Sequence, residues 1–333
     1  MTQDVCPPGA LAELPPLRCA DSARMRGAPL HASAVRYRRF LLLEVPGPWG
    51  SSALEGKHLD ASVARQLAAA AAAADTHVLL IRRPGRHPSA GSVTRRDAMA
   101  WAFADTASGT ERVLWGAWRD PADLLSLDLT ADIPGEANAA GAQRLALVCT
   151  NGKRDQCCAI RGRPVAAAVA AVTDWDTWEC SHLGGHRFAA NIMLLPTGDM
   201  FGWLDPESAV EVLRRFDAGQ FMLSNYRGRA GQPVPVQAAL HVAAVRLGEF
   251  RRDAIWVSSV RPAPAGSDAG RPEHPAEDPD LWEVEVIHRT EHSPGTAYRV
   301  IMAGSPLAPT LLSCADSNPK AEIRYETLSF SRV

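Results

Sequence analysis

The sequence predicts an α/β protein made of two similar halves, followed by a β-rich C-terminal region. Short apolar runs alternate with helical segments over residues 37–232, and the same order of elements occurs twice within this range. Residues 233–333 instead alternate apolar and polar positions in the manner of antiparallel strands. With 333 residues, the chain is long enough for two ordinary domains.

The first half is predicted over residues 37–135, after a loop-rich lead-in at 1–36 that contains many prolines and alanines. Four runs in this half have the composition of strands, at 39–45, 76–83, 96–105 and 111–118. Two segments have the composition of helices, at 59–75 and 120–129. Asp120 is suited to cap the second of these helices, and Pro121 suits its first position.

The second half is predicted over residues 140–232 and has the same order, β-α-β-β-β-α. Its predicted strands lie at 144–149, 177–183, 188–198 and 200–205, and its helices at 163–175 and 205–219. The last helix opens with Asp-Pro, as its counterpart in the first half does, but the spacing between matched elements is uneven. We therefore expect a diverged internal duplication, and the order of elements fits a thioredoxin-like α/β unit.

The C-terminal extension, residues 233–333, is predicted to be a helix followed by a β-rich appendage. The helix is expected at 235–247, and strands are expected at 251–260, 281–290, 297–304 and 322–330. The intervening stretch at 261–280 is rich in Pro, Gly and Asp, which predicts a surface loop.

Composition and charge indicate a globular protein with neither a nucleic-acid nor a membrane partner. Hydrophobic residues make up 46% of the chain, and the formal net charge is −2. The most apolar-looking run, 67–74, is short and rich in alanine, far below the length of a membrane span. The N-terminus lacks the basic and apolar regions of a secretory signal, so we expect a cytoplasmic protein.

The seven cysteines matter because thiols in a reducing compartment stay unpaired, so a local group of them suggests a metal or redox role. Such a group occurs only around 149–180. It contains Cys149 and Cys158, followed by His182 and His186 in an H-x3-H pair. Thiolate and imidazole ligands together favour zinc or iron–sulfur chemistry.

The two glycines between the histidines, Gly184 and Gly185, argue against a helix that would carry both imidazoles on one face. They instead allow the backbone to approach a bulky inorganic group, which favours a ligand loop.

The remaining cysteines have less specific interpretations. Cys157 is an alternative ligand to its neighbour Cys158, Cys180 is expected to be a buried strand residue, and Cys6, Cys19 and Cys314 are expected to be structural or incidental thiols.

Three stretches of the second half resemble the sucrase/ferredoxin-like family. They are "CTNGKRDQCCAIRGRPVAAAV", "WECSHLGGHRFAANIMLLPTGDMFGWLDPESA" and "YRGRAG", and the resemblance covers roughly residues 37–247. The family consists of thioredoxin-like 2Fe–2S ferredoxins in which an H-x3-H pair replaces two cysteines. The implied ligands are Cys149, Cys158, His182 and His186, with the cysteines on one iron and the histidines on the other.

"CCAIRG" also resembles the CAxxG motif of all-cysteine thioredoxin-like ferredoxins, which implies Cys158 rather than Cys157 as the ligand. In the first half, Val45 falls near the position that corresponds to Cys149. His87 is the only histidine of that half that corresponds to a member of the H-x3-H pair. That half is therefore expected to lack a cluster and to serve packing or partner binding.

The resemblance implies an electron carrier with unidentified redox donor and acceptor proteins, rather than a catalyst. No pair of carboxylates supports a sucrase activity. Neutral imidazole ligands should raise the reduction potential and can couple it to a proton. The alternatives are a structural zinc protein and a metal-free thioredoxin-like protein-binding module. Basic residues near the site would screen a cluster, dock an acidic partner or form only a solvated rim; they are Lys153, Arg154, Arg161, Arg163 and Arg187.

Overall fold

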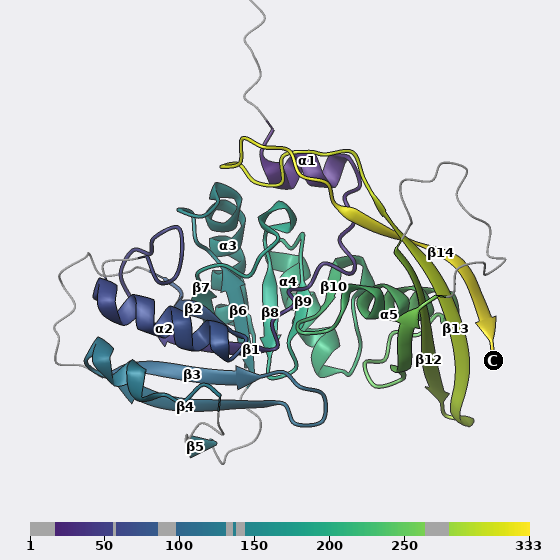
Figure 1. The fold of residues 1–333 in the computed structure, drawn as a ribbon, viewed down its shortest axis with the longest axis horizontal. Helices are drawn as coiled ribbons and strands as arrows, with labels where there is room; N and C mark the ends of the chain where they lie inside the picture. Colours follow the sequence, from purple (N-terminus) through teal and green to yellow (C-terminus); the bar gives the residue numbers. More distant parts are fainter. Residues whose placement is uncertain (1–16, 56–57, 86–97, 131–135, 138–143, 264–279) are drawn as a thin grey trace, which may run out of the picture.

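The computed structural model describes residues 17–55, 58–85, 98–130, 136–137, 144–263 and 280–333. These residues form a mixed α/β structure with one ten-stranded sheet and a separate four-stranded sheet (Figure 1). Within the described ranges, no helix is long and apolar enough to cross a membrane.

The first half of the large sheet follows the predicted order closely. Its elements are β1 (Arg39–Glu44), α2 (Ala61–Ala73), β2 (Thr76–Arg82), β3 (Met99–Asp105), β4 (Arg112–Trp118), the 3-10 helix η1 (Pro121–Ser126) and β5 (Glu136–Ala137). Strands β1 and β2 are parallel and are linked through α2, whereas β3 pairs antiparallel with β1. Strand β1 is buried on both faces, which explains why its sequence is a continuous apolar run.

The second half repeats this arrangement. Its elements are β6 (Leu145–Cys149), α3 (Gln156–Val172), β7 (Asp176–Cys180), the 3-10 helix η2 (His186–Phe188), β8 (Ile192–Leu195), β9 (Asp199–Phe201), α4 (Pro206–Asp217), η3 (Leu223–Asn225) and β10 (Tyr226–Arg229). Strands β6 and β7 are parallel, and β8 pairs antiparallel with β6. The strand orders β2-β1-β3-β4-β5 and β7-β6-β8-β9-β10 therefore match, as an internal duplication would require.

The two halves join where β2 and β7 pair antiparallel at the centre of the sheet. Ile81 pairs with Cys180, and Arg82 pairs with Glu179. The Arg82 guanidinium lies 2.7 Å from the Glu179 carboxylate, and both side chains are buried. Both halves consequently contribute to one continuous sheet.

The C-terminal extension consists of α5 (Val234–Leu247) and an antiparallel sheet of β11 (Ile255–Pro262), β12 (Asp280–Thr290), β13 (Ser293–Pro306) and β14 (Ile323–Arg332). Helix α5 packs against this sheet with Ala239 and Ala243, which are fully buried against Val284 and Val300. Most of the predicted loop at 261–280 lies outside the described residues. Figure 1 shows the small sheet at the end of the molecule opposite α2.

Three local predictions differ from the structure. The lead-in contains a helix, α1 (Cys19–Met25), whose Cys19, Ala20 and Ala23 are buried. The segment at 120–129 forms only the short 3-10 helix η1, although Asp120 caps it as predicted.

Helix α3 was predicted to begin at residue 163 but begins at Gln156. Pro164 favours a helix start in the sequence, yet it lies inside the helix. The true start is set by Asp155, whose carboxylate accepts a hydrogen bond from the backbone N–H of Cys157 at 2.8 Å. Cys157 and Cys158 therefore lie in the first turn of α3 and not in a loop.

Candidate metal centre

The four predicted ligands all come from the second half, at the carboxyl end of its two parallel strands. Cys149 ends β6, Cys158 lies in the first turn of α3, His182 follows β7 by two residues, and His186 begins η2. In open α/β sheets this edge is where ligands usually bind. The sequence spacing and the fold thus place the two cysteines and two histidines at one edge of the sheet.

Three of the four residues converge closely. One donor atom from each of Cys149, Cys158 and His182 lies within 4.8 Å of the other two. His186 is not part of that group, but the centroid of its ring lies 5.4 Å from that of His182, with the rings inclined by 25°. A single tetrahedral zinc, with ligand bonds of about 2.0–2.3 Å, holds its four donors within roughly 4 Å of one another. The outlying position of His186 therefore suits a group larger than one ion.

The histidine rings carry polar atoms that lack partners. Nδ1 of His182 and Nδ1 of His186 are both buried and accept or donate no hydrogen bond among the described residues. An unpaired polar atom in the interior costs about 1–3 kcal/mol, so two of them side by side need an explanation. Burial also lowers the pKa of His186, which keeps its imidazole neutral as metal ligation requires. The residues present therefore fit a bound metal group.

The two thiols are also prepared for ligation. Cys149 and Cys158 are almost completely buried. A hydrogen bond from the Cys158 thiol lowers the pKa of Cys149 well below its usual value, while the same pairing, with burial, raises the pKa of Cys158. A lowered pKa favours the thiolate of Cys149, the form that binds metals.

Two glycine features explain the local sequence. Gly184 and Gly185 adopt φ angles of +73° and +69°, in the left-handed region that side chains disfavour. A Cβ on Gly162 would lie 2.1 Å from the carbonyl oxygen of Cys149, so only glycine lets α3 pack this closely against the end of β6. Gly162 is the glycine of the CAIRG segment, so the close packing of α3 against β6 explains why this position of the motif is a glycine.

Arg227, on β10, is a component that sequence reasoning missed. Its side chain is only 1% exposed. Its Nη1 donates to the carbonyl oxygen of Gly184 at 3.1 Å and to Oδ1 of Asn191 at 2.9 Å, and its Nε donates to Oγ of Ser33 at 3.0 Å. None of these acceptors is charged. Burial lowers the pKa of Arg227 to about 9, and the thiols of Cys149 and Cys158 oppose that effect. The guanidinium is thus a buried cation that donates to the loop between the two histidines.

The "YRGRAG" stretch contains Arg227, but nothing in the sequence distinguishes it from the neighbouring arginine Arg229. Arg229 forms an ordinary ion pair with Glu111 at 2.5 Å. Only the fold shows that one arginine is buried below the Gly184–Gly185 loop and that the other pairs with an acid.

The predicted basic residues have different roles. Arg187 binds Glu322 of the C-terminal extension at 2.5 Å, and Arg161 pairs with Asp21 of α1. Arg163 is exposed on α3, and Lys153 and Arg154 are exposed in the turn before that helix. Two of the five residues therefore attach other segments to the site, rather than forming a solvated rim.

His182 is reachable from a cavity of about 500 Å³ between the two halves. The cavity is lined by Tyr37 and His77 from the first half and by Arg154, Ser181 and His182 from the second. His77 stacks on Tyr37 with ring centroids 4.7 Å apart, and its Nε2 lies 3.4 Å from the carbonyl oxygen of His182. The first half thus forms one wall of an opening to a candidate ligand.

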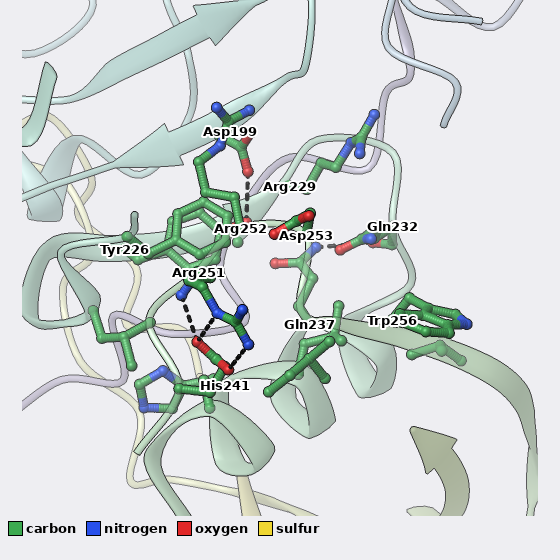
Figure 2. Close-up of a pocket in the computed structure, with 18 of the residues that line it drawn as sticks. Asp199, Tyr226, Arg229, Gln232, Gln237, His241, Arg251, Arg252, Asp253 and Trp256 are labelled. Carbon is green, nitrogen blue, oxygen red and sulfur yellow. Dashed lines mark hydrogen bonds and ion pairs between the residues drawn. The ribbon is translucent and has the colours of Figure 1, made fainter. Parts of the chain in front are cut away.

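A second cavity, of about 510 Å³, lies between β10, α5 and β11 and contains none of the predicted ligands. Figure 2 shows Tyr226, Arg251, Arg252 and His241 around it. Its three acidic groups already have partners, because Asp199 accepts from the Tyr226 hydroxyl at 2.7 Å, Glu249 binds Arg251 at 2.8 Å and Asp253 binds Arg289 at 2.5 Å. Among the described residues that line it, this cavity therefore has no carboxylate without a partner.

The remaining cysteines lie in two places. Cys180, the last residue of β7, is buried in the core next to Cys149, as expected for a strand residue. Cys157 does not face the same way as Cys158. Its sulfur lies beside those of Cys19 and Cys314, in a separate group described below.

The comparisons agree with the resemblance seen in the sequence. The model of the family described as "Sucrase/ferredoxin-like" matches residues 30–228, more than half of the chain. Neither the curated proteins nor the solved structures gave a match. The Cys/His edge of the sheet defines a candidate metal-binding protein. The chain belongs to the sucrase/ferredoxin-like family.

Proposed function

We propose that this protein is an electron carrier whose second half is a thioredoxin-like ferredoxin domain. Cys149, Cys158, His182 and His186 would hold a 2Fe–2S cluster, with the cysteines on one iron and the histidines on the other. The observation that carries the proposal is the pair of buried, unpartnered Nδ1 atoms beside a buried thiol pair. A metal group is the simplest partner for all four side chains.

The arrangement favours a cluster over the two alternatives. A structural zinc would need four donors within reach of one ion, and His186 lies outside the group formed by the other three. A metal-free binding module would leave both Nδ1 atoms unpaired at a cost in stability, without any gain. A two-iron group accommodates donors that are farther apart.

Electron transfer is the chemistry that such a cluster supplies when bound. The protein's own residues would tune it. Arg227 is a buried positive charge that donates to the loop between the histidines, and such a charge favours the reduced, more negative state of a nearby cluster. Neutral imidazoles in place of two thiolates act in the same direction, so the potential should exceed that of plant-type ferredoxins.

The cavity beside His182 supports the proposed proton coupling. If the buried Nδ1 atoms are the ligands, Nε2 is the atom left to carry a proton on each ring. His182 lines a cavity of about 500 Å³, which gives solvent and buffer a route to that imidazole. The first half would then shape access for protons and for redox partners, instead of carrying a cluster.

A cytoplasmic location remains part of this proposal. All six cysteines among the described residues are unpaired thiols, as a reducing compartment would keep them.

Metal analysis and spectroscopy of the purified full-length protein test the proposal. We expect a red-brown protein with two irons and two inorganic sulfides per chain, as the 2Fe–2S formula requires. The variants His182→Cys and His186→Cys should keep a cluster but shift its absorption and EPR signals, because they replace a ligand by another competent one. A colourless protein with one zinc that depends on His182 would overturn the proposal.

A further inference from the structure

A second group of metal-binding side chains lies on the other face of the first turn of α3. It consists of Cys19 on α1, Asp155 and Cys157 at the start of α3, and Cys314 in the segment between β13 and β14. One donor atom from each residue lies within 4.8 Å of the other three. The sulfur of Cys157 is 3.6 Å from that of Cys19 and 3.6 Å from that of Cys314. Three of these four residues are buried.

The sulfur spacing matches a single tetrahedral ion. With a zinc–sulfur bond of about 2.3 Å, tetrahedral geometry places the thiolate sulfurs about 3.8 Å apart. The observed 3.6 Å is close to this value, although disulfide sulfurs would lie much nearer, at about 2.05 Å. A 2Fe–2S cluster would divide these four ligands between two irons, and a 4Fe–4S cluster would bind each of them to a different iron, so either cluster would spread the donors farther apart.

Asp155 has room for a fourth bond. Its Oδ2 accepts hydrogen bonds from the backbone N–H of Cys314 at 2.8 Å and from Ser313 Oγ at 2.9 Å. Its Oδ1 accepts one from the backbone N–H of Cys157 at 2.8 Å and one from the Cys19 thiol at 3.6 Å. A carboxylate oxygen has two lone pairs, so a cation that replaces the Cys19 thiol proton would free the second lone pair of Oδ1 for a fourth bond.

We propose that Cys19, Asp155, Cys157 and Cys314 form a second metal site that takes one thiophilic divalent cation, for which zinc is the best match. Three thiolates and one carboxylate are ligands of a closed, structural zinc site, in which the metal holds chain segments together. The site is independent of the cluster, because the two groups share no side chain.

The position of the site gives it a role. Cys19 and Cys314 lie 138 and 157 positions in sequence from Cys157 of α3, so the ion would join the two terminal regions to the ferredoxin half. Figure 1 shows α1 and the segment before β14 side by side above the end of α3. Helix α1 packs on η2, which begins with His186, and Glu322 binds both Arg26 and Arg187. The ion would therefore hold α1 and the segment before β14 against η2, on the histidine side of the proposed cluster.

Zinc and iron analysis of the full-length protein, purified without chelators, tests this site. We expect one zinc per chain in addition to any cluster iron. Cys314→Ser and Cys19→Ser should lower the affinity for zinc by more than about tenfold, so that zinc is lost to a chelator that leaves the wild-type site filled, because a lost ligand weakens binding at least as much as a lost supporting residue. Iron, sulfide and the visible spectrum should be retained. Cys6→Ser is the matched control and should change neither metal.

Four outcomes would overturn the site. Two concern zinc content: stoichiometric zinc that survives Cys314→Ser, and wild-type protein that neither contains zinc nor takes it up from Zn²⁺ solution. The other two are iron in place of zinc in this site, and a disulfide among Cys19, Cys157 and Cys314 in freshly purified protein. Zinc that is lost in His182→Ala but retained in Cys314→Ser would place zinc in the first site instead. That result would count against both proposals, whereas zinc-free, iron-loaded protein would count against this one alone.

Discussion

The two halves of the large sheet have the same strand order but differ at the positions that matter for chemistry. In the first half, β1 leads into Val45, which is buried with Trp49 and Leu80 in an apolar core. In the second half, β6 ends with Cys149, which faces Cys158 and His182. The strand end and the following helix start exist in both halves, so the fold alone does not create a metal site. A few side chains on that frame form the candidate site.

The halves also differ in what surrounds the strand ends. Helix α2 packs through ordinary apolar residues such as Val63 and Leu67, whereas α3 begins with two cysteines and contains Gly162 for close approach. The outer strand β10 carries the buried Arg227, whereas the described part of its counterpart β5 is Glu136–Ala137. His87, the retained histidine of the first half, lies outside the described residues. The comparison implies that the metal site needs coordinated changes in ligand, packing and charge.

The largest effect is expected when Cys149 of the second half is replaced by valine, the residue at the corresponding position of the first half. Cys149→Val should abolish cluster binding, because it removes one of the two proposed thiolate ligands. The apolar surroundings of this residue should accept valine, so the circular dichroism spectrum should remain that of a folded α/β protein. Iron and sulfide analysis measures the loss.

Cys180→Ala is the control for Cys149→Val, since Cys180 is buried beside Cys149 but is not in the metal-binding group. It should retain the cluster. Full iron content in Cys149→Val would contradict the ligand assignment.

The next effect concerns the glycine loop that distinguishes the second half. Gly185→Ala places a Cβ 2.5 Å from Nη2 of Arg227 and also strains a left-handed backbone. Gly248→Ala introduces a similar strain at φ +64° but meets nothing within 4 Å. Gly248→Ala should cost about 1–2 kcal/mol of unfolding free energy. Gly185→Ala should cost about 1–3 kcal/mol more, because of the clash.

Chemical denaturation of the two glycine variants measures this difference. The cluster absorption should also change in Gly185→Ala and stay unchanged in Gly248→Ala. Equal losses of stability and unchanged spectra in both would show that Arg227 does not support the loop.

The candidate metal-binding residues could be selected from the sequence because they lie in short local motifs. Cys149, Cys158 and the H-x3-H pair lie within one predicted unit, and strand ends and turns place them at one edge. Cys157 could not be separated from Cys158 without the true start of α3. Neighbouring helical residues point about 100° apart, so a helix beginning at Gln156 sends the two thiols to different sites.

Long-range contacts were not readable from the sequence. Cys19 and Cys314 lie 138 and 157 positions from Cys157, and nothing in their local sequences links them. Arg227 became notable only through its burial without a carboxylate partner among the acceptors of its hydrogen bonds. A buried cation and a site assembled from distant segments both depend on tertiary packing that no local pattern encodes.

A smaller effect is expected from the charge that only the second half carries. Arg227→Met should lower the reduction potential by tens of millivolts, because a buried positive charge near the cysteines favours the reduced state. Arg227→Lys keeps the charge and should shift the potential less, although it loses the hydrogen bonds to the Gly184 loop. Arg163→Gln removes an exposed charge on α3 and should have almost no effect. Protein-film voltammetry of the three variants separates charge from positioning, and equal potentials in all of them would exclude an electrostatic role for Arg227.

The pH dependence of the reduction potential distinguishes a histidine-ligated half from an all-cysteine one. When the oxidised protein loses a proton from a histidine Nε2, reduction must take that proton back, so the potential falls as pH rises. The slope should approach about 59 mV per pH unit, the value for one proton per electron, and should flatten below the imidazole pKa of the oxidised form. The double variant His182→Cys/His186→Cys has no such proton and should show a nearly flat profile between pH 6 and 10. A flat profile in the unmodified protein would rule out proton coupling at these imidazoles while leaving the cluster itself intact.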